Sequence, residues 1–545
     1  MSEIPWDVYP RPRLRRAEWQ CLNGEWELER GGEKCPVTVP YPIESGLSGV
    51  SLQIETGKTY SYKRRFTLSF EPGNREVWLN FGAVMRKAKV FVNGELAAEH
   101  DNGYLPFSAM ISPLLRAGEN ELRVEVVNDL DPRYPYGKQR VKRGGMWYTP
   151  CTGIWQTVWL EPRPREHVTG IRAESKGAKV TVFVDGVKTG MLVVGGERYL
   201  FSGGRAELTV KNPVYWSPEN PKLYDITVTA GEDEVKSYFA LRELAIKTVN
   251  GKKRLMLNGK PYFFHALLDQ GYWADGLYTP KGPEAFAKDI AAMKSLGFNT
   301  LRKHIKIEPE LYYYACDRLG MAVFQDMVNA GKYHFIRDTV LPTLGVIKRD
   351  DRRLFRDKTM RESFLSGMEA TVKHLEGYPS IVLWTVFNEG WGQFEASRAY
   401  ERLKALDPTR FIDSASGWYD CGKSDVESRH IYFKKLSLGK EDRAQLLSEF
   451  GGWSYKIPEH SFNLKKTYGY RKYSDRAEFI RDLRKLYLEE VVPLARAGLC
   501  GAVYTQLSDV EDETNGMFTF DRQVLKIKPE ELSGIAEELN KAVSE

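Results

Sequence analysis

The fold class of this chain is decided by one stretch of sequence, Ile381-Val382-Leu383-Trp384-Thr385-Val386-Phe387-Asn388-Glu389-Gly390. Its apolar run predicts a buried strand, and the run ends on a carboxylate. A carboxylate at the tip of a buried strand is costly to desolvate and contributes little to packing. In a barrel of parallel strands the carboxyl ends carry the chemistry, so Glu389 is a candidate catalytic residue.

A second apolar run, Leu446-Leu447-Ser448, leads in the same way into Glu449-Phe450-Gly451-Gly452. Glu389 and Glu449 could therefore face each other across the mouth of one barrel. Paired carboxylates are the minimal equipment for cleaving a glycosidic bond. The structural alternative is that each glutamate forms an ion pair at the end of its strand.

The C-terminal part of the chain, residues 243–545, alternates strand-like and helix-like segments. The expected strands are 262–267, 299–304, 321–326, 381–388, 411–415, 429–433, 446–449 and 499–506. Helical spacing of apolar residues predicts helices over 284–296, 478–494 and 530–542. Eight strands alternating with helices are typical of a catalytic (β/α)8 TIM barrel.

The N-terminal part of the chain reads as β-structure without helices. Residues 1–165 contain short alternating strands and the hairpin signal Asn93-Gly94, which predict a jelly-roll β-sandwich. Residues 166–242 continue the pattern and predict a small immunoglobulin-like β-sandwich. Two long connections in the third domain, 328–357 and 451–475, would rise from the C-terminal face of the barrel, where long loops usually serve binding.

The composition excludes several classes of protein. The net charge is only +6, and no Lys/Arg block of the kind that follows a nucleic-acid backbone is present. The six cysteines are scattered, which argues against a disulfide framework and a zinc site, and no metal or cofactor is expected. No apolar run reaches membrane-spanning length, and the N-terminus lacks a secretory signal, so the expected location is the cytoplasm.

Several motifs recur in one order along the chain. The N-terminal ones are Arg11-Pro12-Arg13-Leu14-Arg15-Arg16-Ala17-Glu18-Trp19, Leu22-Asn23-Gly24-Glu25-Trp26, Gly103-Tyr104-Leu105-Pro106-Phe107 and Gly153-Ile154-Trp155-Gln156. The barrel motifs are Leu257-Asn258-Gly259-Lys260-Pro261, Leu301-Arg302-Lys303-His304, Asn388-Glu389 and Ser448-Glu449-Phe450-Gly451. Together they resemble glycoside hydrolase family 2, whose best-known members are β-galactosidases, β-glucuronidases and β-mannosidases. The resemblance covers nearly the whole length and implies a retaining mechanism.

The resemblance implies a role for each catalytic and neighbouring residue. Glu389 would be the general acid/base and Glu449 the nucleophile, so one carboxyl starts protonated and the other ionised. Arg302 would keep Glu449 charged, and Asn388 would hold the sugar 2-hydroxyl. Tyr432 matches the position whose hydroxyl bonds the nucleophile. Alternatively, Arg302 forms a barrel-mouth ion pair and Tyr432 is a core residue.

Four further residues are expected to bind substrate. His304 and His430, at strand tips, would line the sugar pocket, although His430 could equally be a hydrogen-bonded structural residue. Trp391 and Trp453 follow the catalytic motifs on loops and are candidate platforms for stacking against the sugar.

The sugar itself is less well specified. The segment Gly516-Met517-Phe518-Thr519-Phe520-Asp521-Arg522-Gln523 closely resembles the β-glucuronidase branch, whose Asn-x-Lys motif binds the uronate carboxylate. Here Glu513 and Asn515 occupy the matching positions, and the added negative charge disfavours a uronide. We therefore expect an exo-acting β-glycosidase for a neutral hexoside, a galactoside first. An arabinoside, a uronide, or a non-catalytic carbohydrate-binding protein are the alternatives, and the protein could form a homo-oligomer.

Overall fold

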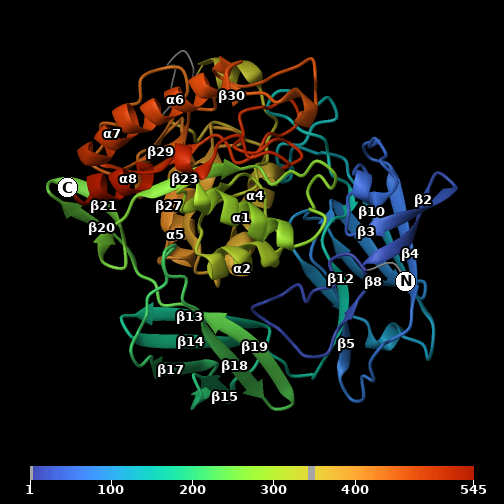
Figure 1. Ribbon diagram of the computed structural model, residues 1–545. Coiled ribbons are helices and arrows are strands. Elements are labelled where there is room, and N and C mark those ends of the chain that lie inside the picture. The colour runs from blue at the N-terminus through green and yellow to red at the C-terminus, as the bar shows by residue number, and fades with distance from the viewer. Residues whose placement is uncertain (1–3, 342–349) are drawn as a thin grey trace.

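The computed structural model of the protein describes residues 4–341 and 350–545. The predicted fold class is confirmed: two β-sandwiches precede a barrel of parallel strands. Figure 1 shows the first sandwich in blue on the right, the second in green at the bottom, and the barrel above and to the left.

The N-terminal sandwich consists of two main antiparallel sheets and a short pair of strands. One sheet has the order β1 (Gln20–Cys21), β12 (Val158–Arg163), β5 (Glu76–Phe81), β9 (Phe107–Met110). The other has the order β3 (Glu33–Val39), β2 (Gly24–Arg30), β4 (Thr59–Phe66), β10 (Asn120–Val127), β7 (Lys87–Val92), β8 (Glu95–His100). The pair is β6 (Val84–Met85) with β11 (Gly153–Ile154). Alternate residues of β10, namely Leu122, Val124 and Val126, are fully buried in the core between the sheets.

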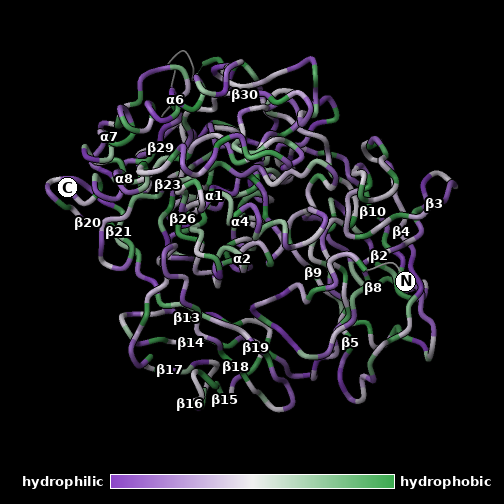
Figure 2. The backbone as a smooth tube through the Cα atoms, in the orientation of Figure 1, coloured by the Kyte–Doolittle hydropathy of each residue, from purple (hydrophilic) through white to green (hydrophobic). Residues whose placement is uncertain are grey.

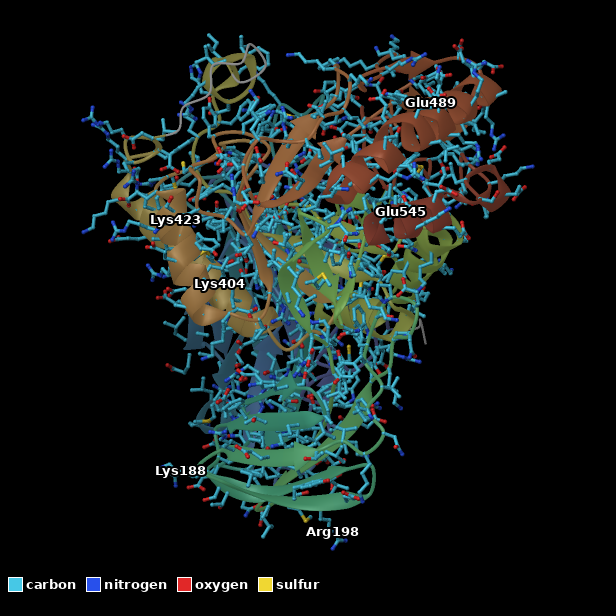
Figure 3. All side chains as sticks on the ribbon, turned by 90° about the vertical axis from the view of Figure 1, so that its left-hand side faces the viewer. Lys188, Arg198, Lys404, Lys423, Glu489 and Glu545 are labelled. Carbon is cyan, nitrogen blue, oxygen red and sulfur yellow. The ribbon has the colours of Figure 1, made fainter. Side chains whose placement is uncertain are left out.

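The middle sandwich is built from one seven-stranded sheet that folds over a single core. Its order is β13 (Gly170–Lys176), β14 (Lys179–Asp185), β17 (Arg205–Thr209), β16 (Glu197–Ser202), β15 (Thr189–Val194), β18 (Tyr224–Ala230), β19 (Asp233–Phe239). β16 and β17 pair only through Ser202 and Arg205, so the two halves can turn toward each other. Hydrophobic and hydrophilic residues alternate along these strands (Figure 2). Lys188 and Arg198 mark the end of this domain farthest from the barrel (Figure 3).

A small antiparallel sheet joins the middle sandwich to the barrel. It contains β20 (Leu244–Val249), β21 (Lys252–Leu257) and β22 (Lys260–Pro261). Arg254 of β21 is buried and donates hydrogen bonds to the carbonyl oxygens of Ala495 and Leu499, at 2.8 and 3.2 Å. This contact fixes the sheet against the side of the barrel opposite the mouth.

The barrel contains eight parallel strands. Their order is β27 (Phe411–Ser416), β26 (Ile381–Asn388), β25 (Ala322–Asp326), β24 (Thr300–Lys303), β23 (Phe264–Asp269), β32 (Leu499–Tyr504), β29 (Ala444–Phe450), β28 (Val426–Ile431). β27 and β28 lie side by side and close the ring. The strand predicted over 429–433 is displaced: β28 starts three residues earlier and ends before Phe433, which is 73% exposed. The apolar pair Ile431-Tyr432 made the strand seem to continue, but the chain turns outward there.

Helices cover the outside of the barrel. They are α1 (Glu284–Ser295), α2 (Glu310–Leu319), α4 (Lys358–Leu375), α5 (Ala396–Leu406), α6 (Arg476–Leu486), α7 (Val492–Ala497) and α8 (Ile535–Ser544). Two π-turns, η3 (Ile336–Val340) and η5 (Tyr487–Val491), and four short 3-10 turns, η1 (Gly46–Ser48), η2 (Ser112–Leu114), η4 (Pro458–His460) and η6 (Pro529–Glu531), complete the described helical segments. The helix predicted over 478–494 is thus α6, η5 and α7 in succession. The final predicted helix begins late, because Gly534 has φ +83° and separates η6 from α8.

The mouth of the barrel is formed by loops from two domains. The connection after β25 includes residues 342–349, which lie outside the described residues, and the connection after β29 contains β30 (Ser454–Tyr455) and β31 (Lys472–Tyr473). The third contributor is the segment between β10 and β11 of the first sandwich. Its Tyr136 donates hydrogen bonds from its backbone N–H to Asn329 and from its hydroxyl to Gly331, both at 3.1 Å. Among the described residues, no helix is long and apolar enough to cross a membrane.

Candidate active site

The two glutamates predicted to be catalytic meet at the mouth of the barrel. Glu389 directly follows β26, and Glu449 lies at the end of β29. A carboxylate oxygen of each lies within 4.8 Å of the other. Retaining glycosidases hold their carboxyl groups about 5 Å apart, whereas inverting enzymes hold them about 6.5–9.5 Å apart to admit a water molecule. The separation fits the retaining class.

Glu389 adopts a backbone conformation that a non-glycine residue rarely adopts. Its φ is +54°, and its N–H donates to the carbonyl of Ser416 at 2.9 Å. Gly390 follows at φ +70°, and a Cβ there would lie 2.0 Å from the Tyr419 ring. Such strain persists only where the surroundings hold the chain, and it is concentrated at functional sites. Here it directs a partly exposed carboxylate into the mouth.

Glu449 is buried and surrounded by donors. It accepts hydrogen bonds from Arg302 at 3.2 Å and from the hydroxyl of Tyr432, and Nε2 of His430 lies 3.6 Å away. Burial alone would raise the pKa of Glu449, but the charges of His430 and Arg302 outweigh it and lower the pKa to about 2. Glu449 is therefore ionised at neutral pH.

Arg302 connects the residues beneath the two glutamates. Its guanidinium donates to Asp326 at 3.0 Å, to the Ser448 carbonyl at 2.9 Å and to Asn388 Oδ1 at 2.8 Å, besides Glu449. Burial lowers its pKa, but the carboxylates of Asp326 and Glu449 reverse this and raise it above the usual value. The side chain is only 1% exposed, so it positions other groups and does not itself face a sugar.

Asn388 is oriented by this contact. Because its Oδ1 accepts from Arg302, its amide NH₂ points the other way, and none of the described residues accepts a hydrogen bond from it. The amide is thus available as a donor beside Glu389.

His430 bridges the two glutamates instead of lining the pocket. Its Nδ1 lies 2.8 Å from Glu389 Oε1, and its Nε2 lies 3.2 Å from the Ser416 hydroxyl. The side chain has no exposed surface. We therefore revise its expected sugar contact: His430 positions Glu389 and Glu449.

His304 is buried beside Asp326. Its Nδ1 lies 2.6 Å from an Asp326 carboxylate oxygen, which can only accept, so Nδ1 carries the hydrogen. Burial and the charge of Lys138 lower the pKa of His304 to about 4. Its Nε2 is buried and has no hydrogen-bond partner among the described residues, which leaves a bare acceptor.

Of the two tryptophans predicted to stack against the sugar, Trp391 lies beside Glu389 and Trp453 does not. Trp391 is 5% exposed, donates from Nε1 to the Gly331 carbonyl at 2.8 Å, and lines a small recess with Asn388 and Glu389. The Trp453 ring instead packs near Tyr473 and Arg471 and is not among the residues that line this recess.

Several residues at the site were missed by sequence reasoning. Lys138, Met146 and Trp147 of the first sandwich and Tyr333 of the barrel line the recess at Glu389. Tyr470 was not missed, because it belongs to the long connection 451–475 that was expected to serve binding; it stacks on Tyr432 with ring centroids 3.7 Å apart. The one signal available was the run of cations from Lys138 to Arg143 within a domain of otherwise alternating strands.

The catalytic cluster also contains the donor atoms of a possible cation site. Within the described chain, Glu389, His430 and Glu449 are the group whose donor atoms lie close enough to hold an ion. The guanidinium of Arg302, 3.2 Å from Glu449, opposes a second cation at that point.

Comparisons with known proteins agree with this arrangement. The description "Glycosyl hydrolase 2 galactose-binding domain-like" matches residues 46–155, "Glycosyl hydrolases family 2" matches 167–242, and "Glycosyl hydrolases family 2, TIM barrel domain" matches 248–445. The last match ends just before Glu449.

Similar curated proteins and solved structures are named as beta-glucuronidases and beta-galactosidases. A beta-glucuronidase of Felis catus is 25% identical over 83% of this chain and 78% of its own length. A beta-galactosidase of Alteromonas mediterranea is 25% identical over 75% of this chain, which spans only 40% of that longer protein. The structure of a beta-D-glucuronidase from Dictyoglomus thermophilum superposes with a TM-score of 0.75, covering 98% of both chains at 19% identity.

Three successive matches to one family, in order and over most of the sequence, agree with the three domains of the fold. The chain belongs to glycosyl hydrolase family 2.

Proposed function

We propose that the protein is a retaining exo-β-glycosidase, with Glu449 as nucleophile and Glu389 as general acid/base. The observation that carries this proposal is the pair of carboxylates within 4.8 Å in unequal surroundings. Glu449 is buried among donors that keep it ionised, whereas Glu389 is 20% exposed and contacts one imidazole. This asymmetry separates a permanent anion from a group that can exchange a proton.

The reaction has two steps. In the first, a Glu449 oxygen attacks the anomeric carbon while Glu389 gives its proton to the departing glycosidic oxygen, which leaves a covalent glycosyl-enzyme. In the second, Glu389 takes a proton from water, and the resulting hydroxide displaces Glu449 from the sugar. The configuration at the anomeric carbon is therefore retained.

Neighbouring groups would support the charge that develops in the transition state. The free amide of Asn388 is placed to donate to the sugar 2-hydroxyl, a bond that strengthens as the ring becomes cationic. Tyr432, whose pKa is raised far above its usual value by burial and by Glu449, remains a donor to the nucleophile. Trp391 and Trp147, which line the small recess beside Glu389, would form part of the wall around a terminal sugar.

The comparisons bear on the reaction more than on the sugar. The related proteins carry the names beta-glucuronidase and beta-galactosidase, so they support a β-glycosidase without choosing between an acidic and a neutral sugar. We also propose domain boundaries near residues 165 and 242, supported by the gaps between β12 and β13 and between β19 and β20.

A mechanism-based label tests the proposal directly. A 2-deoxy-2-fluoro glycosyl fluoride should accumulate as an ester on Glu449, and peptide mass spectrometry should find the sugar there. Glu449→Gln should abolish turnover of nitrophenyl glycosides. Glu389→Ala should slow poor leaving groups most and be rescued by azide. Both variants retaining wild-type rates would rule the proposal out, and binding of sugars without hydrolysis would favour the non-catalytic alternative.

A further inference from the structure

A cation from the first sandwich reaches the catalytic recess in the barrel. Lys138 lines this recess together with Asn388, Glu389 and Trp391. Its charge also acts on His304, Glu449 and Glu513, as the pKa values of those three groups show. Lys138 therefore lies in the same recess as Glu389, beside the catalytic pair.

The backbone around Lys138 is held rigidly. Its carbonyl accepts from the N–H of Tyr148 at 3.0 Å. The next residue, Gln139, is 1% exposed; its side chain accepts from the Cys151 N–H at 2.7 Å and donates to Tyr104 and to the Tyr136 carbonyl, both at 3.0 Å. The segment therefore presents Lys138 in a preorganised position.

The ammonium group of Lys138 has no acceptor. Across residues 4–341 and 350–545, no carboxylate forms an ion pair with it and no oxygen accepts from it, and its nearest aromatic ring is Tyr148 at 5.9 Å. By contrast, Arg143 in the same segment pairs with Glu511 at 3.5 Å.

Glu513, whose negative charge was expected to disfavour an acidic substrate, does not neutralise the positive charge of Lys138. Glu513 is 4% exposed, and its Oε2 accepts from Gln506 at 2.6 Å. Burial raises the pKa of Glu513 to about 7, against the opposing effect of the Lys138 charge. At slightly acid to neutral pH, Glu513 therefore keeps much of its proton. A protonated Glu513 carries no negative charge, so it does not repel a uronide as the sequence alone suggested.

We infer that Lys138 is a specificity-determining residue that binds an anionic oxygen group on the terminal sugar, either a uronate carboxylate or a sulfate ester. The inference rests on the proposed function, because it places that sugar on Glu389 and Glu449. The Glu389 carboxylate lines the recess and a Glu449 oxygen lies within 4.8 Å of it, so an anion is repelled there unless a cation faces it. Among the described residues that line the recess, Lys138 is the cation.

The test measures kcat/KM of the full chain on matched nitrophenyl β-glycosides. The set contains a glucuronide, a galacturonide and a 6-sulfogalactoside, with the glucoside and galactoside as their neutral counterparts. Lys138→Met removes the charge and keeps the length, Lys138→Arg keeps the charge, and Lys142→Met removes a solvent-exposed cation of the same loop.

We expect the wild type to prefer an acidic glycoside over its neutral counterpart. Lys138→Met should lower kcat/KM for that acidic glycoside about tenfold or more and leave the neutral ones within about threefold, because a hydrogen bond to a charged group is lost. Lys138→Arg should recover most of the loss, and Lys142→Met should behave as the wild type. The preferred acidic arm identifies carboxylate or sulfate as the group bound.

Two other outcomes would overturn the inference. If neutral glycosides are cleaved at least as well as acidic ones, or if Lys138→Met slows both alike, Lys138 does not select an anion, while dependence on Glu389 and Glu449 keeps the proposed function. If no glycoside is cleaved and no fluoro sugar labels Glu449, the proposed function fails and the inference falls with it.

Discussion

Arg302 shows how much one side chain contributes at the residue scale. Its guanidinium donates to Asp326, Asn388, Glu449 and the Ser448 carbonyl in fixed directions. A lysine has the charge but cannot direct donors along several fixed lines at once. The geometry of the site therefore depends on a planar fork and not merely on positive charge.

Arg302→Lys is accordingly expected to lower kcat/KM by about a hundredfold or more, since each lost bond to a charged group is worth about 1.5–3 kcal/mol. The measurement is steady-state turnover of a nitrophenyl glycoside. Arg254→Lys is the control, because Arg254 bonds only to backbone carbonyls away from the mouth and should lower thermal stability without changing kcat/KM. Equal turnover in Arg302→Lys and wild type would refute the positioning role.

The ionisation of Glu449 makes the free energy of unfolding depend on pH in the acid range. Folding lowers its pKa from 4.5 to about 2, so the unfolded state binds more protons between those values. Its contribution is fully present above about pH 4.5 and is lost as the pH falls toward 2. The difference in free energy of unfolding between wild type and Glu449→Gln should thus shrink by about 2 kcal/mol from pH 6 to pH 3. Urea denaturation at both pH values measures it, and a constant difference would contradict the assigned ionisation.

Glu513 makes the stability of the folded protein depend on pH in the opposite direction. Folding raises its pKa from 4.5 to about 7, so the folded state binds more protons in that interval and stability falls as the pH rises. Glu513→Gln keeps an acceptor for Gln506 without a charge to bury. Relative to wild type it should gain up to about 3 kcal/mol between pH 4.5 and pH 8. A variant that gains nothing over this range would show that Glu513 is charged in the folded protein.

At the element scale, the turn after β29 holds Tyr432, whose hydroxyl donates a hydrogen bond to Glu449. Gly452 has φ +65°, and a Cβ there would lie 2.4 Å from the ring of Tyr470, which stacks on Tyr432. Gly452→Ala should displace this stack, weaken the Tyr432–Glu449 bond and lower kcat about tenfold. Gly422→Ala is a matched control, because Gly422 has φ +86° and open space around it. Both substitutions should cost stability in thermal melts, and a loss of activity in both alike would argue against the stack.

Elements whose pattern is set by burial were predictable. The bounds of β26 match the expected 381–388, because every residue of that strand is buried and the apolar run records it. Phe286, Ile290 and Met293 of α1 are likewise buried as their spacing predicted. β28 was displaced because its buried residues are interrupted by partly buried polar ones such as Glu427 and Arg429, which leaves a weak apolar signal in the sequence. Which strand ends approach each other is set by barrel closure, and the sequence carries that only indirectly.

At the scale of the whole molecule, the site is shared between two domains. Glu389, Glu449, Asn388 and Arg302 come from strand ends of one barrel, so the order of motifs was enough to find them. Lys138 comes from a loop of another domain. Its place depends on how the sandwich docks, for example through the Thr149 N–H bond to Glu511 at 2.8 Å. A single sequence does not record such docking.

Trp147 tests the contribution of the sandwich. Its ring lies 5.0 Å from that of Trp391, at 75°, and lines the catalytic recess. Trp147→Ala should raise KM and lower kcat/KM about tenfold or more, since one wall of the recess is removed. Trp78→Ala truncates a tryptophan that packs on His167 elsewhere in the same sandwich and should leave kcat/KM unchanged. Identical kinetics of the two variants would mean that the sandwich only braces the barrel.

The loop that carries Lys138 and Trp147 belongs to the first sandwich and contacts the barrel through hydrogen bonds such as those of Tyr136 and Thr149; it is not part of the barrel's own strands and connections. The residues proposed to cleave the glycosidic bond and those proposed to select the sugar are therefore encoded in separate stretches of the gene. Exchanging the segment between β10 and β11 is expected to change which glycosides are accepted while leaving the catalytic strands, and the bond cleavage proposed for them, intact.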